Sequence, residues 1–535
     1  MIDGVVGHTH AEASPRRSRR PAQPPTAAPG EHENPPRRRK AIGASTTAGQ
    51  KPATTAGTAP ATAARCSQRQ RLLDAITDLA VRDGYAAATV GEIVALAGVS
   101  RPTFYAYFTD KEDCFLAALA PIRQRLLDDL AAAVGAEPPQ DATTALTVTL
   151  VSFAASQPST ARLLMSDPLA GGRRVMDARD ELITQAALLL EDAFQRAPAR
   201  AMIPDLPPGL LIGVVCRLIA CRLREGEPRL TEILHEILDW LAAYELPAGE
   251  HRWRTLAPVA PLARSPFLPP TALRAPPALA PGRQRITEDA VSENHWLRVV
   301  FATAEVVARD GYAAATVAEI VRLAGVDGRV FYRLFASKQQ ALAAARELFF
   351  RHAMAVTAGA FAAGETWPEC LWEAARALTQ SVEQSPTLSH VSFVESHSGG
   401  PLAMRRLEEL ACAFTIFLQE GYRYEPARRP GSHAGPSRLA QEAIITSVFE
   451  LCYLQAREHG GPALSAHLGH VVFVSLAPFL GADAANDFLD QKASAGRGDT
   501  HPPGRAASRR ARRGSRAAAG PRRQTVAPAP RGSLT

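Results

Sequence analysis

Between residues 101 and 107 the chain carries one guanidinium, one hydroxyl and two phenol groups at close spacing, on Arg101, Thr103, Tyr105 and Tyr107. Phe104 and Phe108 lie among them and would occupy the inner side of a short helix, which leaves the polar set on the outer side. Guanidinium and hydroxyl groups on an exposed helix can hydrogen-bond to base edges in the major groove of DNA. The chemistry that this segment indicates is therefore recognition of double-stranded DNA.

The residues before this segment predict the elements that would present it. Thr89 precedes an apolar run with Glu92 three residues later, which is a capping box for a helix over residues 90–97. Residues 98–100 then have the length of a helix-turn-helix turn, and Ser100 is a suitable N-cap for a helix over residues 101–108. Exposed helix N-termini offer N–H groups to phosphate oxygens, so Thr89 and the helix that starts at Lys111 are predicted clamps on the DNA backbone.

The same pattern occurs twice. A shift of 227 residues aligns residues 82–111 with residues 309–338, with 20 of 30 positions identical. Weaker similarity continues, since residues 156–182 parallel 383–410 and residues 211–234 parallel 443–468. A repeat of this extent indicates that a whole block was duplicated. The pattern alone leaves one alternative open, a compact three-helix bundle that keeps tyrosines on its surface and has no role in DNA binding.

The segment over residues 89–119 resembles the DNA-binding part of the tetracycline-repressor (TetR) family of bacterial regulators. The similarity consists of a T-x-x-x-I-x-x-x-A-G-V-S turn, an F-Y-x-x-F signature and a lysine three residues after its last phenylalanine, and the motifs recur in the second copy with Asp327 at the serine position. The resemblance implies an all-α subunit of nine helices, in which three N-terminal helices bind operator DNA and the others dimerise and enclose a small-molecule pocket. It also implies that ligand binding releases the DNA.

By this resemblance, residues of the first copy take specific roles. The start of the recognition helix, which reads bases, corresponds to Ser100, Arg101 and Thr103, the phosphate contacts to Tyr105 and Lys111, and the clamp of the second helix to Thr89. The second copy departs from the pattern, because Asp327-Gly328-Arg329-Val330 replaces Ser100-Arg101-Pro102-Thr103. An aspartate near DNA repels phosphate, and a glycine at a helix start costs up to about 1 kcal/mol relative to alanine. DNA contacts are still expected from the residues that remain suitable, Thr316, Arg329, Tyr332, Arg333 and Lys338.

Charge and proline content divide the chain. The net charge is +7, and because the first 65 and last 45 residues carry +6 and +10, residues 66–490 carry −9. An acidic folded part favours a specific reader of DNA over a protein that coats nucleic acid. The expected order is a basic disordered tail (1–65), a first DNA-binding domain (66–119), a first helical ligand-binding or dimerisation domain (120–246), a proline-rich linker (247–288), a second DNA-binding domain (289–348), a second helical domain (349–490) and an Arg-rich disordered tail (491–535).

Several classes of protein are not indicated. No uninterrupted run of 18 apolar residues and no signal-peptide pattern occurs, so we expect a cytoplasmic, nucleoid-associated protein of a bacterium and no membrane partner. The seven cysteines are scattered without a C-x-x-C pair, which argues against disulfides and a structural zinc site. No phosphate-binding glycine loop, nucleophile elbow or H-E-x-x-H motif occurs. We therefore expect no enzyme, no catalytic or metal-binding residue and no cofactor.

The tandem arrangement raises the question of which domains pair. The 42-residue linker, treated as a coil, spans about 35 Å, and tethering gives effective concentrations on the order of millimolar. Both favour pairing of the two copies within one chain, as a pseudo-dimer with two unlike recognition helices and a non-palindromic operator. Pairing of two chains through like copies, as a homodimer, remains an alternative.

The expected function is a sequence-specific transcriptional regulator, a repressor whose operator binding is relieved by a small, apolar ligand that the sequence does not identify. Apolar residues of the later helices are candidates for the ligand pocket: Phe153, Met165, Phe194, Trp372 and Phe393. The alternative is a helical ligand-binding or interaction protein in which one or both DNA-binding heads have lost affinity for DNA.

Overall fold

The computed structural model describes residues 58–85, 87–165, 172–226, 230–247, 272–279, 287–395, 400–424, 435–457 and 464–496. The expected N-terminal tail before residue 58, most of the expected linker and the Arg-rich segment after residue 496 lie outside these residues. Contacts within the chain separate residues 1–60 from one compact unit of Ala61–Thr535, to which the contacts reported below belong.

The first helix-turn-helix head is formed by α1 (Thr58–Asp83), α2 (Val90–Ala97) and α3 (Arg101–Tyr105). The capping box places the start of α2 at the predicted residue, and Gly98 ends this helix with a left-handed backbone at φ 62°. The third helix is shorter than expected and ends at Tyr105. The chain turns there, because the amides of Tyr107 and Phe108 both donate to the carbonyl of Phe104.

Six further helices of the first copy lie among the residues that the structure describes. They are α4 (Lys111–Ala136), α5 (Ala142–Ser156), α6 (Pro158–Met165), α7 (Arg173–Arg196), α8 (Pro208–Glu225) and α9 (Leu234–Ala242), with short 3-10 segments η1 (Pro139–Asp141) and η3 (Leu230–Ile233). A short antiparallel pair, β1 (Met202–Pro204) and β2 (Glu245–Pro247), places Ile203 opposite Leu246. This small strand pair was not expected from the sequence.

The second copy repeats the plan. Its head consists of α10 (Glu288–Asp310), α11 (Val317–Ala324) and α12 (Gly328–Leu334). The helices that follow are α13 (Lys338–Phe361), α14 (Trp367–Gln384), α15 (Pro386–Phe393), α16 (Gly400–Cys412), α17 (Arg438–Arg457), α18 (Leu468–Leu480) and α19 (Ala482–Gly496), with 3-10 segments η6 (Ala413–Tyr422) and η8 (Leu464–His467). Helix α19 extends six residues into the segment expected to be the C-terminal tail.

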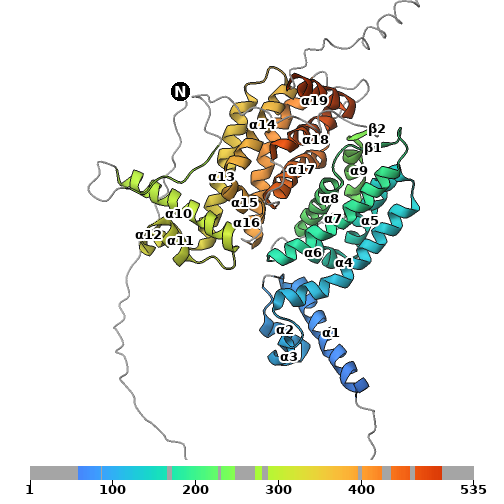
Figure 1. The fold of residues 1–535 in the computed structure, drawn as a ribbon, viewed down its shortest axis with the longest axis vertical. Helices are drawn as coiled ribbons and strands as arrows, with labels where there is room; N and C mark the ends of the chain where they lie inside the picture. The colour runs from blue at the N-terminus through green and yellow to red at the C-terminus, as the bar shows by residue number, and fades with distance from the viewer. Residues whose placement is uncertain are drawn as a thin grey trace, which may run out of the picture. The chain divides into compact units, whose positions relative to one another are not determined.

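The expected fold class, all-α with two tandem units that each begin with a helix-turn-helix head, is confirmed (Figure 1). Among the described helices, none combines the length and apolar character required to cross a membrane. The described residues also contain no group of three or more His, Cys, Asp or Glu side chains that would suit a metal ion.

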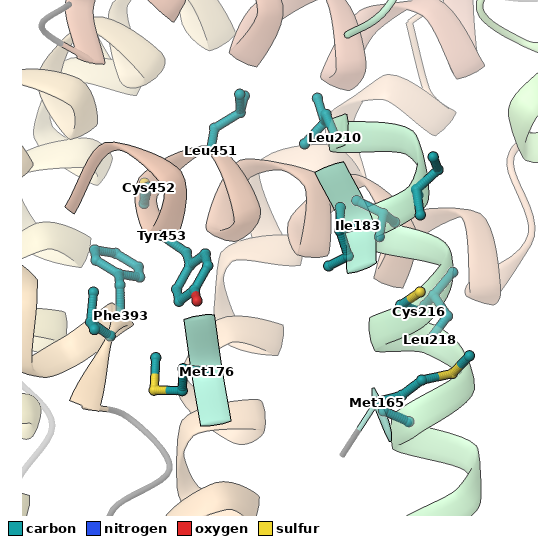
Figure 2. Packing of buried hydrophobic residues seen from close by; sticks show 14 of the residues in the cluster. Met165, Met176, Ile183, Leu210, Cys216, Leu218, Phe393, Leu451, Cys452 and Tyr453 are labelled. Atoms are coloured by element: carbon teal, nitrogen blue, oxygen red, sulfur yellow. The ribbon is translucent and has the colours of Figure 1, made fainter. Parts of the chain in front are cut away.

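Helices α8 and α17 bring the two copies into contact, and both lie side by side in Figure 1. Helix α8 also packs on α7, and α17 also packs on α16 and α9. The apolar part of this region is continuous, since Ile183 and Cys216 of the first copy and Leu451 and Cys452 of the second belong to one buried cluster (Figure 2). The later helices of the two copies thus share one core.

Candidate nucleic-acid interface

The start of α2 is an exposed helix N-terminus with a complete capping box. The hydroxyl oxygen of Thr89 accepts the amide of Glu92 at 3.3 Å, and the amide of Thr89 donates to the Glu92 carboxylate at 2.9 Å. Thr89 itself is exposed. The remaining amides of the first turn therefore lie at the surface, as a phosphate clamp requires.

The start of α3 carries the predicted base-reading residues. The hydroxyl oxygen of Ser100 accepts the amide of Thr103 at 3.3 Å, and the two hydroxyls are 2.8 Å apart. Arg101 is exposed, and its guanidinium lies close to α2, since a Cβ at Gly91 would be 3.4 Å from its Nη2 atom. The structure thus brings the starts of α2 and α3 together on the surface of the head.

The two tyrosines of this segment have different environments. Tyr105 is 58% exposed, and its ring stands edge-on to the buried ring of Phe104, with centroids 5.3 Å apart. Tyr107 is half-buried, and its hydroxyl donates to the side-chain oxygen of Gln68 in α1 at 3.4 Å. Tyr105 is therefore available at the surface, whereas Tyr107 connects the turn after α3 to α1.

Lys111 and Lys338, the lysines that follow the F-Y-x-x-F signature, contact a backbone carbonyl and a tyrosine ring of their own head. Lys111 donates to the carbonyl of Tyr85 at 3.0 Å, and its ammonium lies 4.3 Å from the centroid of the Tyr85 ring. Burial lowers the pKa of this ammonium. Lys338 repeats the arrangement with Tyr312, at 2.8 Å from the carbonyl and 4.6 Å from the ring centroid. In both heads the lysine holds the turn that precedes the second helix.

The second head keeps the arrangement with different groups. Asp327 acts as the N-cap of α12, where its carboxylate accepts the amide of Arg329 at 2.8 Å. Arg329 and Arg333 are exposed, and Tyr332 is 63% exposed. Thr316 caps α11 by accepting the amide of Glu319 at 3.2 Å. The substitution of serine by aspartate thus preserves the cap and adds a negative charge beside two exposed arginines.

One basic residue in each head was missed by reasoning from the sequence. Arg71 of α1 lies beside the turn glycine, because a Cβ at Gly98 would be 3.6 Å from its Nη1 atom. Arg298 of α10 lies beside Gly325 in the same way, because a Cβ at Gly325 would be 2.7 Å from the Nη2 atom of Arg298. Arg71 and Arg298 are 227 residues apart, which is the shift of the internal repeat, and this match could have identified them in the sequence. Each guanidinium adds positive charge at the C-terminal end of the second helix, where it is favourable.

The comparison with protein families is decisive for both heads. Residues 72–118 and 300–345 each match the family described as bacterial regulatory proteins, tetR family. The chain thus matches the tetR-family model twice in tandem, once in each head. No curated protein matches the chain significantly.

Solved structures of bacterial regulators are similar to this chain over about a third of its length. The fatty acid degradation regulator FadR from Bacillus halodurans is 17% identical with a TM-score of 0.29, and the match covers 33% of this chain and 94% of that chain. A TetR family transcription regulator from Marinobacter aquaeolei VT8 is 18% identical with a TM-score of 0.27, over 33% and 97%. Regulatory protein TetR from Rhodobacter sphaeroides is 21% identical with a TM-score of 0.27, over 34% and 99%.

The candidate ligand residues of the two copies are spread over five helices. Phe153 of α5 is half-buried against the core, and Met165 is buried at the end of α6. Phe194 of α7 lines a hollow of about 340 Å³ together with Pro204 and His470. Trp372 is buried in α14, and Phe393 of α15 packs on Phe349, Phe350 and Phe449. In Figure 2 Met165 and Phe393 lie on different helices.

Proposed function

We propose that this protein is a sequence-specific, DNA-binding transcriptional regulator in which one chain supplies both recognition helices. The observation that carries the proposal is the exposed guanidinium of Arg101 at the capped start of α3, on a head that matches the tetR family. Within this proposal the chain represses transcription, and a small, mainly apolar effector relieves the binding to the operator.

The proposed contacts divide into two kinds. Arg101 and Thr103 read base edges, since their side chains stand on the first turn of α3. Thr89 and Tyr105 hold phosphates and fix the position of the head without adding sequence preference. Ser100, Tyr107 and Lys111 support these residues through bonds inside the head.

The second head uses a different set of groups. Arg329 and Arg333 are the proposed base or phosphate contacts of α12, with Thr316 and Tyr332 on the phosphates and Lys338 behind them. Because Asp327-Gly328-Arg329-Val330 and Ser100-Arg101-Pro102-Thr103 present different groups, the two heads prefer different half-sites. The operator is therefore non-palindromic.

We infer that the two copies pair within the chain, and buried charges at their contact support this. Glu450 of α17 is 1% exposed and forms an ion pair with Arg217 of α8. Its other oxygen lies 3.8 Å from Arg179 of α7, whose side chain is 2% exposed. Both arginines belong to the first copy, and the carboxylate belongs to the second. A buried charge of this kind requires its partner, because its removal from water is costly.

Pairing of like copies lacks this complementarity. The sequence pair Arg-Glu occurs at 224–225 and again at 457–458, and aligning the two pairs makes Arg217 of α8 and Glu450 of α17 equivalent positions. Two first copies would therefore bring Arg217 against Arg217, and two second copies would bring Glu450 against Glu450. Buried like charges repel each other strongly, so unlike copies are the favoured partners.

The test is selection of bound DNA from a random pool by the full chain, read together with the mass of the complex. We expect a motif with two unlike halves, bound by one chain. Arg101→Ala should remove the sequence preference in one half, whereas Arg125→Ala, which removes an exposed charge from α4, should leave the motif unchanged. A clean palindrome bound by two chains would contradict pairing within the chain, and the absence of any motif would contradict the function itself.

A further inference from the structure

A cavity of about 470 Å³ lies between the two copies, and neither DNA-binding head contributes to it. Helix α8 forms one wall, and α16, η6 and α17 form the other. Its apolar lining includes Ala220, Leu407, Ala411, Ile445 and Phe449. Charged side chains surround this lining, and most of them are already paired across the copies, as in the bond of 2.8 Å between Arg222 and Glu442. This size suits a small organic molecule.

The internal repeat identifies the counterpart of this cavity on the other side of the contact between the copies. The parallel segments that end at Leu182 and Leu410 make Asp180 of α7 equivalent to Glu408 of α16. The register of α8 and α17 makes Arg224 equivalent to Arg457. The ion pairs agree with both assignments, because Arg224 binds Glu408 and Arg457 binds Asp180, the latter at 3.1 Å. The two sides of the contact are therefore related by the repeat.

The same register makes Ala220 equivalent to Tyr453, and this difference explains why the cavity exists on one side. Tyr453 is 1% exposed and donates its hydroxyl to the two Asp180 oxygens at 2.9 and 2.8 Å. In Figure 2 this hydroxyl points away from α17, toward the part of α7 near Met176. Ala220 has no ring, and it lines the cavity together with Glu408.

Glu408 is the counterpart of Asp180, and its carboxylate has acceptor sites left for a further hydrogen bond. Asp180 accepts from Tyr453, Arg179 and Arg457. Among the described residues, the bonds to Glu408 all reach its Oε1 atom, from Arg224 and, weakly at 3.9 Å, from the thiol of Cys221. A carboxylate has about four sites for donors. Glu408 can therefore accept a further hydrogen bond from a molecule in the cavity.

We propose that this cavity binds a small phenol, with its hydroxyl donating to Glu408 and its ring against Leu407. The ring takes the place that the Tyr453 side chain occupies on the other side. Arg179 lies over the Tyr453 ring with its Cζ 5.7 Å from the ring centroid, and its equivalent in the second copy is Leu407. The cavity thus offers an apolar contact to the ring in addition to the acceptor. Binding of the phenol does not depend on the proposed function, because it involves no DNA. A regulatory effect of the bound phenol does rest on the proposed function.

The natural probe is 4-methylphenol, because it is the tyrosine side chain as a free molecule. Calorimetric titration of the full chain should show saturable binding of one equivalent. Toluene has the same ring without the donor, and we expect it to bind at least about 10-fold more weakly, since a site with a charged acceptor discriminates against a ligand that cannot donate. Equal affinity for toluene and 4-methylphenol would overturn the role of Glu408, and no saturable binding would overturn the site.

Variants of Ala220 locate the binding. Ala220→Tyr supplies the missing ring from α8 and should reduce the affinity for 4-methylphenol by at least about 10-fold, and Ala220→Leu fills part of the same space if the tyrosine variant does not fold. Ala132→Leu, at an exposed position of α4, is the matched control and should bind as the unaltered chain does. Unchanged affinity in a folded Ala220 variant would overturn the site.

The opposite change tests the relation between the two sides. Tyr453→Ala should open a second cavity next to Asp180 and raise the number of bound 4-methylphenol molecules from one to two. A folded variant that still binds one would contradict the equivalence of the two sides. None of these titrations contains DNA, so a failure here leaves the proposed DNA binding untouched, and a failed selection of DNA leaves this site untouched.

Discussion

Glu450 carries a full charge in the interior only because two arginines of the other copy lie beside it. Burial alone would raise the pKa of this carboxyl, but Arg217 and Arg179 outweigh it and lower the pKa below its ordinary value of 4.5. The three residues therefore behave as one unit, and removal of the carboxylate leaves two cations without a counter-charge.

Glu450→Gln keeps the size of the side chain and removes its charge. We expect the free energy of unfolding to fall by about 3 kcal/mol, since the arginines stay buried without a counter-charge. Urea unfolding of the full chain measures this change. Glu409→Gln is the control, because that carboxylate is 64% exposed and pairs with Arg406 at the surface, so a change within about 0.5 kcal/mol is expected. Equal effects of the two substitutions would show that the buried cluster contributes little.

The same variant makes a prediction about pH. A carboxyl whose pKa is lowered by folding contributes stability above its unfolded pKa and loses this contribution as pH falls through the folded pKa. The difference between the unaltered chain and Glu450→Gln should therefore be full at pH 7 and shrink below about pH 4.5. A difference that stayed constant down to pH 3 would mean that the carboxylate is not the titrating group.

At the scale of elements, local patterns predicted the heads well. The bounds of α2 and the capping box at Thr89 follow from residues within four positions of each other, and the structure has both. The end of α3 was predicted too late, because a turn at Ala106 returns Phe108 to the core and no local residue marks it. The partner of Tyr107 was also beyond reach, since Gln68 lies 39 residues earlier in the sequence.

Contacts between elements of different copies were the part that the sequence could not supply. Asp180 and Tyr453 are 273 positions apart, and the packing of α8 on both α7 and α17 brings them together. The cavity depends on the same packing, because Ala220 is unremarkable in its own helix and acquires meaning only beside Glu408. The spacing of apolar residues along one helix does not show which residues of a distant helix it will contact.

The cap of α2 provides a prediction at this scale. Thr89→Ala removes the acceptor for the Glu92 amide and should destabilise the start of α2 by about 1 kcal/mol. DNA affinity should then fall by a similar factor for all sequences, because a phosphate contact carries no base preference. Amide hydrogen exchange in α2 and binding to selected and random DNA at one salt concentration measure the two effects. Thr89→Ser, which keeps the hydroxyl, is the control, and a loss confined to the selected sequence would contradict the assigned role.

At the scale of the whole molecule, the buried charges predict which halves stay together. A protease site introduced between residues 247 and 272 would let the chain be cut after it has folded. We expect the two halves to remain a one-to-one complex in native mass spectrometry, because Arg217 and Arg179 need Glu450. With Glu450→Arg the cut halves should separate. Complexes of two identical halves would contradict the preference for unlike partners.

The contact of α8 with α17 inside one chain also affects how the occupancy of the DNA site depends on the number of chains in a cell. A regulator assembled from two separate subunits loses its active form with the square of the subunit concentration once it is diluted below its dimer dissociation constant. On the proposed pairing within the chain, both heads are joined through one core, and no such equilibrium applies. Occupancy of its operator should therefore follow the first power of the number of chains in a cell, down to very few copies.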